Sequence, residues 1–164
     1  MKLLSLESLN DLQKDAVQKL WNEEYPKSIA LKTKQDLESY LEKLQGQSHI
    51  LLSNESETII GWFFGFIRED ERWFAIIVNS NAHKKGYGST LLNRAKSLYV
   101  ELNGWVITDA SHTKADSSAY IFPLGFYQKS GFSVLENETF ETDKMKTVKN
   151  QMDQGLRLNL HFKL

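Results

Sequence analysis

Hydrophobic residues in the N-terminal part of the chain recur at the spacing of two amphipathic helices. Between residues 8 and 21, apolar side chains return every three or four positions, which places them on one helix face. Ser8, followed three residues later by Asp11, is typical of a helix start. Residues 34–44 repeat the pattern with three leucines on one face. The sequence therefore predicts helices over 8–21 and 34–44, joined by a loop.

Two unbroken hydrophobic runs follow and predict a buried hairpin. Residues 58–67 and 73–78 are apolar at nearly every position, and a charged turn, most simply a hairpin turn, separates them. A strand with one exposed face alternates apolar and polar residues, whereas a strand covered on both faces does not. These runs are therefore expected to be central strands of a sheet, with 49–52 as a shorter strand before them.

A long helix is expected next, with Tyr87, Leu91, Ala95, Leu98 and Leu102 on one stripe. Its apolar stripe continues to Leu102, and Asn103-Gly104 is expected to end it, because glycine is favoured just past a helix. A short buried strand over 105–108 follows.

The C-terminal third adds one more helix and two strands. Pro123 suits the first turn of a helix that runs to about residue 130, and residues 132–135 begin a strand. Residues 136–155 show no pattern that favours either structure. An alternation of apolar and polar residues then predicts a half-buried final strand, carried by Leu156, Leu158, Leu160 and Phe162.

Composition narrows the class of protein. The 164 residues contain no repeat, low-complexity tract or linker, so we expect a single domain over 1–164. A net charge of −1 argues against a protein that coats nucleic acid. The absence of cysteine excludes disulfides, thiolate metal sites and a cysteine nucleophile. The four histidines are scattered, so no metal is expected. No apolar stretch is long enough for a signal peptide or membrane span, so we expect a cytoplasmic protein without membrane contact.

The segment from Trp73 to Leu92 carries the clearest chemical signal. It reads as buried strand, turn with Gly86-Tyr87-Gly88, and helix, with Lys84 and Lys85 beside the turn. Unpaired backbone amides and the positive end of the helix dipole make such a helix start a site for anions. Glycines let a phosphate approach the backbone. The pattern indicates a phosphate-binding turn.

Three other interpretations of this turn can be compared with the sequence. A dinucleotide-binding turn needs a third glycine, where this chain has Leu91, and a nucleoside triphosphate loop needs Gly-Lys-Ser or Gly-Lys-Thr, which does not occur. A nucleotide-binding α/β protein is therefore disfavoured. An ordinary tight turn with two solvated lysines stays open on this segment alone.

Residues 83–92 resemble the acyl-CoA signature of the GNAT superfamily of N-acetyltransferases, which runs Gln/Arg-x-x-Gly-x-Gly/Ala at the start of the long helix. Residues 126–132 resemble the second motif of that family, an aromatic-rich helix that ends in Gly-Phe. The two motifs occur in the family's order with one strand between them, and the resemblance covers about residues 1–135. It implies an α/β GNAT-type acyl-CoA N-acyltransferase fold, with a mixed, mostly antiparallel sheet of six or seven strands and about four flanking helices.

The resemblance also implies a function and a set of site residues. Acetyl-CoA is the expected co-substrate, and a primary amine is expected to attack its thioester directly in a ternary complex. Tyr127 stands at the family's usual position for the proton donor. The CoA-binding residues implied are His83, Lys84, Lys85, Gly86, Tyr87, Gly88 and Ser89 for the diphosphate, and Ile76, Ile77 and Val78 for the pantetheine arm.

The residue that accepts the amine's proton is less clearly marked. Asp109 ends the strand after the long helix, where the resemblance implies that two central strands separate around the thioester. We therefore take it as the candidate base, against a solvated strand-end carboxylate. Glu23 and Glu24 lie in the loop expected to border the acceptor, and they are candidate substrate-binding residues or surface charges. His112 is more simply a solvated loop histidine.

Departures from the family pattern leave a second function open. His83 replaces the usual Gln or Arg, Tyr120 and Pro123 replace the usual Asn and Ala of the second motif, and the strand 73–78 has no acidic residue. A non-catalytic acyl-CoA-binding sensor or interaction domain is therefore the alternative to an active enzyme. The acceptor can be a small-molecule amine or a protein amine, and a homodimer is an expectation from the resemblance alone.

Overall fold

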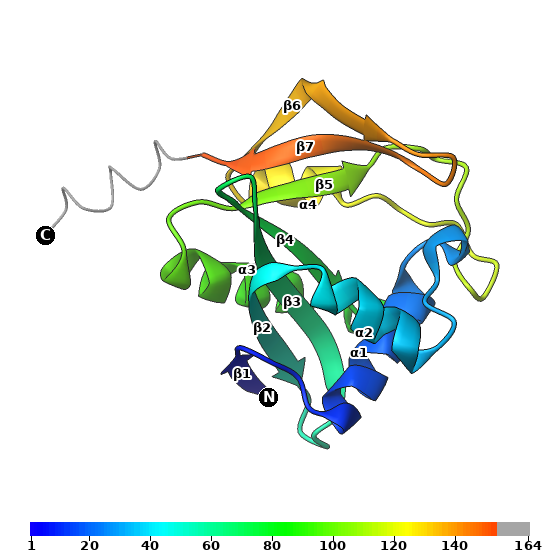
Figure 1. Cartoon of the computed structure of the whole chain (residues 1–164), viewed down its shortest axis with the longest axis vertical. Helices are drawn as coiled ribbons and strands as arrows, with labels where there is room; N and C mark the ends of the chain where they lie inside the picture. Colours follow the sequence, from blue (N-terminus) through cyan, green and yellow to red (C-terminus); the bar gives the residue numbers. More distant parts are fainter. Residues whose placement is uncertain (154–164) are drawn as a thin grey trace, which may run out of the picture.

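A single mixed sheet organises the molecule. The computed structural model describes residues 1–153, and within them seven strands lie in the order β1-β2-β3-β4-β5-β7-β6 (Figure 1). All neighbours are antiparallel except β4 and β5, which are parallel. This confirms the predicted fold class. The strands are β1 (Lys2–Leu6), β2 (Gln45–Ser53), β3 (Ile59–Arg68), β4 (Glu71–Val78), β5 (Asn103–Ile107), β6 (Phe132–Glu141) and β7 (Lys146–Met152). The helices are α1 (Asp11–Glu24), α2 (Lys34–Glu42), α3 (Tyr87–Leu98) and α4 (Leu124–Lys129), with short 3-10 turns η1 (Lys27–Ile29) and η2 (Ser80–Ala82).

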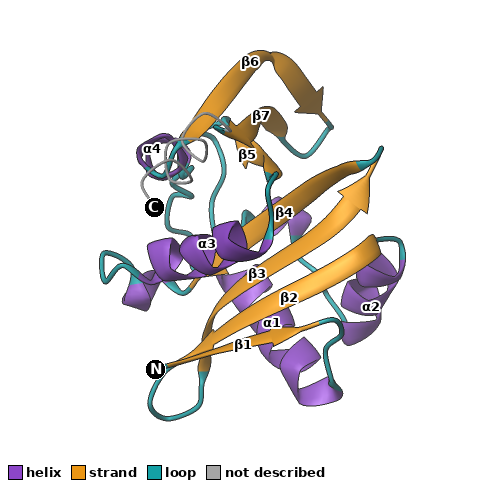
Figure 2. Ribbon diagram, turned by 90° about the vertical axis from the view of Figure 1, so that its left-hand side faces the viewer, coloured by secondary structure: helices purple, strands orange, loops and turns teal. Residues whose placement is uncertain are grey.

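Helices cover both faces of the central strands. Figure 2 shows α3 on one side of β2, β3 and β4, and α1 with α2 on the other. Successive residues of β3 point to opposite faces: Phe63 joins the cluster under α3, while Trp62 and Phe64 join the cluster under α1 and α2. Both faces are covered, so the strand has no polar side chain from Ile59 to Ile67, as its unbroken hydrophobic run predicted.

The parallel strands β4 and β5 touch at one end and separate toward the other. Their ladder has one pair, Trp73 with Asn103, and the carboxyl ends at Val78 and Ile107 diverge (Figure 1). The buried Asn103 side chain fixes this junction, because its Nδ2 donates to Arg72 O at 3.2 Å and its Oδ1 accepts from Gln151 Nε2 at 2.9 Å. The result is an opening in the sheet between the ends of β4 and β5.

The predicted end of the long helix is wrong. Helix α3 ends at Leu98, where the N–H of Tyr99 donates to Ala95 O, and Asn103-Gly104 begins β5 instead. Glycine is needed there for contact rather than for a helix end, because a Cβ on Gly104 would lie 2.7 Å from Asn150 Oδ1. Leu102 continues the apolar stripe because it is fully buried beneath the sheet, not because it is helical.

The start of the first helix also differs from the prediction. Asn10, not Ser8, caps α1: its Oδ1 accepts from Gln13 N, and the Gln13 side chain bonds back to Asn10 N. Helix α2 starts at Lys34 as expected, with Thr33 as its cap. Pro123 stands at the cap of α4, one residue before the helix begins. The short edge strand β1 was not predicted, since most of its residues are exposed.

Residues 136–152, which showed no readable pattern, complete the sheet. They extend β6 to Glu141 and form β7, which inserts between β5 and β6. Strand β7 is difficult to recognise because it buries polar residues: the Lys149 ammonium lies 3.3 Å from a Glu71 oxygen and 3.1 Å from Glu138 Oε2. The final strand predicted from Leu156, Leu158, Leu160 and Phe162 lies outside the described residues. No helix within residues 1–153 has the length and apolar character needed to cross a membrane.

A buried histidine in β2 makes the stability of this fold depend on pH. Trp62 Nε1 donates to His49 Nδ1 at 3.2 Å, and His49 Nε2 lies 3.3 Å from Gln47 Oε1, so the ring fits as the neutral tautomer with its hydrogen on Nε2. Burial lowers the pKa of His49 from 6.5 to about 4. In the unfolded chain the same ring has its ordinary pKa of 6.5, so it becomes protonated as the pH falls below that value. Its contribution to stability is therefore present above pH 6.5 and is lost as the pH falls toward 4.

We predict that the free energy of unfolding falls by about 2 kcal/mol between about pH 7.5 and 5 on account of His49. Urea denaturation at several pH values measures this change. His49→Asn keeps a hydrogen-bond acceptor beside Trp62 but cannot be protonated. Over the same pH interval, the free energy of unfolding of this variant should fall less than that of the wild type, by that amount. Equal slopes in the two proteins would show that His49 is not held neutral by the fold.

Candidate active site

The turn before α3 presents backbone amides at the start of a helix. Gly86 is the N-cap residue, and the first intrahelical bond runs from Thr90 N to Gly86 O at 2.9 Å. The amides of Tyr87, Gly88 and Ser89 precede that bond, so they have no acceptor one turn back in the helix. The structure has the expected helix after the glycine turn, beginning at Tyr87, and the positive end of the helix dipole coincides with these three donors.

Glycine suits the two positions of the turn for different physical reasons. Gly86 has a φ of 78°, a left-handed conformation that favours glycine, and no atom lies within 4 Å of where its Cβ would be. Gly88 leaves room for α4, because a Cβ there would lie 3.2 Å from Phe126 Cζ, closer than ordinary van der Waals contact. The two sequence motifs, far apart along the chain, therefore meet at the first turn of α3.

His83 joins the turn to the end of β4. Its Nε2 lies 2.8 Å from Val78 O, and since a carbonyl only accepts, Nε2 carries the hydrogen. Lys84, with a φ of 59°, and Lys85 are exposed beside it. The imidazole therefore holds the turn against the end of β4 by a hydrogen bond, while the two lysines bring positive charge to the surface of the turn.

One edge of β4 faces the opening in the sheet. Ile76, Ile77 and Val78 pair on their other side with Phe63, Trp62 and Gly61 of β3. Within residues 1–153, the β5 ladder reaches β4 only at Trp73. Along its carboxyl-terminal half, β4 therefore offers backbone groups toward the opening, which is the geometry that allows a ligand to add as a strand.

Three tyrosines from different elements share the interior near this opening. Tyr127 of α4 is 6% exposed and packs edge-on against Phe74 and Phe132. Burial raises the pKa of Tyr127 well above its ordinary value of 10.0, and the nearby Tyr120 adds to the shift. Burial likewise raises the pKa of Tyr25, at the end of α1, with Tyr120 and Tyr127 among the groups that act on it. At neutral pH these phenols stay protonated, so each can donate a hydrogen bond.

Asp109 lies just past β5 and is held in a local turn. Its Oδ1 accepts from Ser111 N at 3.0 Å and from Ser111 Oγ at 2.7 Å. These bonds lower the pKa of Asp109 below its ordinary 3.8, and the nearby His112 and Lys146 lower it further. His112 Nε2 is 3.7 Å from Asp109 Oδ2. Asp109 is thus an ionised carboxylate but a weak base.

Glu23 and Glu24 were predicted in a loop, but they are the last two residues of α1. Their side chains differ in how far they are exposed to solvent. Glu23 has a side chain that is 44% exposed and lies 3.8 Å from Lys19 on the same helix. Glu24 is buried, with 8% exposed. The helix turns neighbouring residues to different sides, so only Glu24 enters the interior.

The partners of Glu24 were not predicted from the sequence. Its Oε1 accepts from Ser80 N at 2.8 Å and from Ser80 Oγ at 3.2 Å, and its Oε2 lies 2.8 Å from Lys114 Nζ. Ser80 and Lys114 are far from Glu24 along the chain, and neither stands in a recognisable motif. Only the folded chain brings α1, the turn after β4 and the loop after β5 together at this carboxylate.

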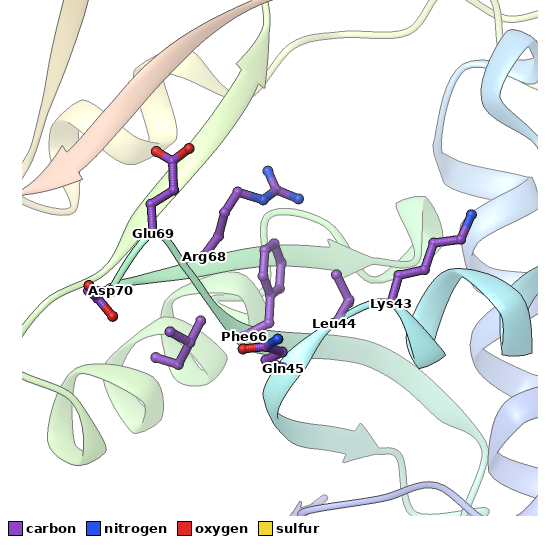
Figure 3. Close-up of a pocket in the computed structure, with 8 residues that line it drawn as sticks. Lys43, Leu44, Gln45, Phe66, Arg68, Glu69 and Asp70 are labelled. Carbon is purple, nitrogen blue, oxygen red and sulfur yellow. The ribbon is translucent and has the colours of Figure 1, made fainter.

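Two surface hollows lie outside the opening itself. One, of about 570 Å³, separates α3 from α4 beside the helix start; it is lined by Ser89, Asn93, Lys96, Gln128, Lys129, Ser130, Gly131 and Asp153. The other, of about 330 Å³, lies at the β3–β4 turn (Figure 3), where Glu69 and Asp70 adopt left-handed conformations with φ of 51° and 61°. It is at the opposite end of β4 from Val78, so the charged residues of this turn do not contribute to the site. Within residues 1–153, no three His, Asp or Glu side chains form a group that could hold a metal ion.

Comparison with known proteins places this geometry in a family. The sequence profile of the Acetyltransferase (GNAT) domain family matches residues 9–153. No curated protein sequence matches the chain. Among solved structures, an aminoglycoside 6'-N-acetyltransferase complexed with coenzyme A is similar, with 11% identity, a TM-score of 0.67, and coverage of 92% of this chain and 96% of that one.

Two further structures have the same fold. An aminoglycoside 6'-acetyltransferase type Ii has 14% identity and a TM-score of 0.66 over 94% of this chain and 97% of its own. The spermidine/spermine N-acetyltransferase SpeG from Vibrio cholerae has 16% identity and a TM-score of 0.61 over 96% of each chain. At these identities the structures establish the fold, while the family match rests on the sequence. Together they show that the chain belongs to the GNAT acetyltransferase family.

Proposed function

We propose that the protein transfers an acetyl group from acetyl-CoA to a primary amine by direct attack within a ternary complex. The observation that carries this proposal is the set of amides of Tyr87, Gly88 and Ser89, which begin α3 beside the opening between β4 and β5. An anion at the helix start and an extended arm along β4 would place a thioester in that opening.

In the proposed complex, the CoA diphosphate binds the turn of residues 83–89. The amides of Gly86 to Ser89 supply hydrogen bonds, and Lys84 and Lys85 supply charge. The pantetheine arm pairs with Ile76, Ile77 and Val78 along the open edge of β4. The hollow between α3 and α4 adjoins Ser89 and contains Lys129, so it suits the phosphorylated adenosine end of the molecule.

The chemistry requires a proton to leave the amine and another to reach the sulfur. A free alkylamine has a pKa of about 10.4, so it arrives charged and must be deprotonated before its nitrogen attacks the carbonyl carbon. The new C–N bond forms as the C–S bond breaks. Asp109 is the candidate for accepting the proton that the ammonium loses before attack. The nitrogen loses a second proton as the amide forms, and Tyr127, which is protonated at neutral pH, is the candidate for delivering a proton to the departing sulfur.

The acceptor is most simply a small-molecule amine. The solved relatives named above include enzymes named for aminoglycosides and for spermidine and spermine, all of which carry amines. A protein amine is the other candidate. We also propose a homodimer, which the resemblance supports, and a cytoplasmic location, which the lack of a long apolar stretch in the sequence supports. The alternative function is a domain that binds acyl-CoA without catalysis. The absence of an acidic residue between Trp73 and Val78 of β4 and the weak basicity of Asp109 favour that alternative.

Calorimetry and an acetylation assay test the proposal together. CoA should bind to the purified protein and ATP should not, because the turn lacks the residues of a triphosphate loop. Thiol release from acetyl-CoA should then appear with at least one member of a panel of diamines, aminoglycosides, amino acids and lysine peptides. CoA binding without thiol release on any amine would favour the non-catalytic domain, and no CoA binding would reject both functions.

We predict that Tyr127→Phe lowers kcat about 100-fold or more while the Kd for CoA stays unchanged, because the phenol contributes only as the thiolate leaves. Steady-state thiol release and calorimetry measure the two quantities. Tyr99→Phe is the matched control, since Tyr99 caps the far end of α3. Equal kcat values for wild type and Tyr127→Phe would remove this hydroxyl from the mechanism.

We predict that Asp109→Asn lowers kcat/KM about 100-fold if Asp109 accepts the amine's proton. Since its pKa lies below 3.8, the ratio of wild-type to variant rates should stay constant between about pH 5 and 8. Asp116→Asn is the control, because Asp116 forms the same turn with Ser118 in an exposed position. A ratio that changes with a midpoint near neutrality would assign the base to another group, and an unchanged rate would leave Asp109 a structural residue.

A further inference from the structure

Glu24 is a buried carboxylate. One of its oxygens accepts hydrogen bonds from Ser80, and the other is paired with the ammonium group of Lys114. Ser80 N and Oγ both donate to Oε1, which fixes the carboxylate against η2, two residues beyond Val78. Oε2 has the Lys114 ammonium at 2.8 Å. The side chains of Glu24 and Lys114 are 8% and 12% exposed. A charge this deeply buried needs a partner, and here the partner is a primary ammonium beside the end of β4.

Lys114 belongs to a separate hairpin in the connection from β5 to α4, which we name the strap (residues 112–120). Tyr120 N donates to His112 O at 3.0 Å and Lys114 N to Ser118 O at 2.9 Å, so the strap holds its own shape. It lies against the end of α1 and η1 (Figure 1), where Lys27 N donates to Thr113 O at 2.9 Å. That hydrogen bond and the Glu24–Lys114 ion pair attach it there, and Tyr120 at its end lies near Tyr25 and Tyr127. A unit closed by its own bonds can lift without unfolding.

The oxygen of Glu24 that Ser80 does not bind selects one kind of cation. A guanidinium binds a carboxylate best through two parallel hydrogen bonds, which need both oxygens. Because Ser80 occupies Oε1, only Oε2 is available, and a point-like ammonium fits a single oxygen better. Exchange of one ammonium for another leaves the buried charge paired throughout.

We propose that Glu24 is a binding site for a primary alkylammonium and that Lys114 occupies it as an internal stand-in until a ligand displaces it and the strap lifts. The inference rests on the proposed function, since it assigns the protonated amine of the acceptor to Glu24. Binding is measurable without acetyl-CoA, so its failure is distinct from a failure of acetyl transfer. Ser80 keeps the carboxylate in place in both states, so the site survives the departure of Lys114.

Lys114→Ala tests the site: the substitution removes the lysine side chain, and a small amine added to the solution can take its place. The variant lacks three methylenes and the ammonium, which n-propylammonium supplies. Its Tm should fall, and n-propylammonium should raise the Tm saturably by several degrees, whereas 1-propanol should not. Glu24→Gln/Lys114→Ala should show no response, because the carboxylate is gone. Lys19→Ala, which removes the lysine of the exposed pair with Glu23, is the matched control and should show no response either.

Wild-type protein gives a second measurement if Lys114→Ala does not fold. Trypsin cleaves after lysine, and the buried, paired Lys114 should be protected from it. If n-propylammonium displaces Lys114, it should accelerate cleavage between Lys114 and Ala115 several-fold. The same concentration of 1-propanol should not. Mass spectrometry follows that bond. The proposal is overturned if the Tm of Lys114→Ala responds no more than that of the double variant, or if cleavage of the wild-type bond is unchanged or slowed by the amine.

Discussion

The separation of β4 from β5 is the constraint on which the rest of the molecule depends. The two strands are parallel, and parallel neighbours normally pair along their lengths, yet here one pair at Trp73 and Asn103 suffices. The cost of the missing ladder is offset at the junction by the Asn103 side chain, which bonds to both sides of it. Strand β5 pairs with β7 along its other edge from Asn103 to Ile107, so within residues 1–153 the facing edges of β4 and β5 have no ladder between them past the junction.

Every other feature of the site is positioned around this opening. Helix α3 starts just beyond the end of β4 and directs its free amides there, while α4 carries Tyr127 up to it from the same face of the sheet. The end of α1 approaches from the opposite face with Tyr25 and Glu24. A seamless sheet would keep these two groups of residues apart. At the gap, phenols from both faces lie within reach of one another, since Tyr120 and Tyr127 both act on Tyr25.

The parts of the fold that the sequence predicted are those decided by neighbouring residues. Strands β3 and β4, the start of α3 and the glycine turn follow from local hydrophobic runs and from backbone demands at Gly86. The parts that it did not predict depend on distant contacts. Leu102 looked helical because it is buried, and β7 looked structureless because Lys149 is paired with Glu71 and Glu138 from other strands.

The same division explains why the co-substrate is easier to read from this chain than the acceptor. The proposed CoA site is built from consecutive residues whose backbone does the binding, so its signature persists as a short motif. The proposed acceptor side depends on Glu24 meeting Ser80 and Lys114, residues separated by 56 and 90 positions, and no spacing encodes that meeting. A carboxylate whose charge is balanced within the chain also leaves no excess of negative charge for composition to reveal. Acceptor preference in such a site therefore depends on how readily the strap yields its own lysine, which is a property of the folded hairpin and not of any motif.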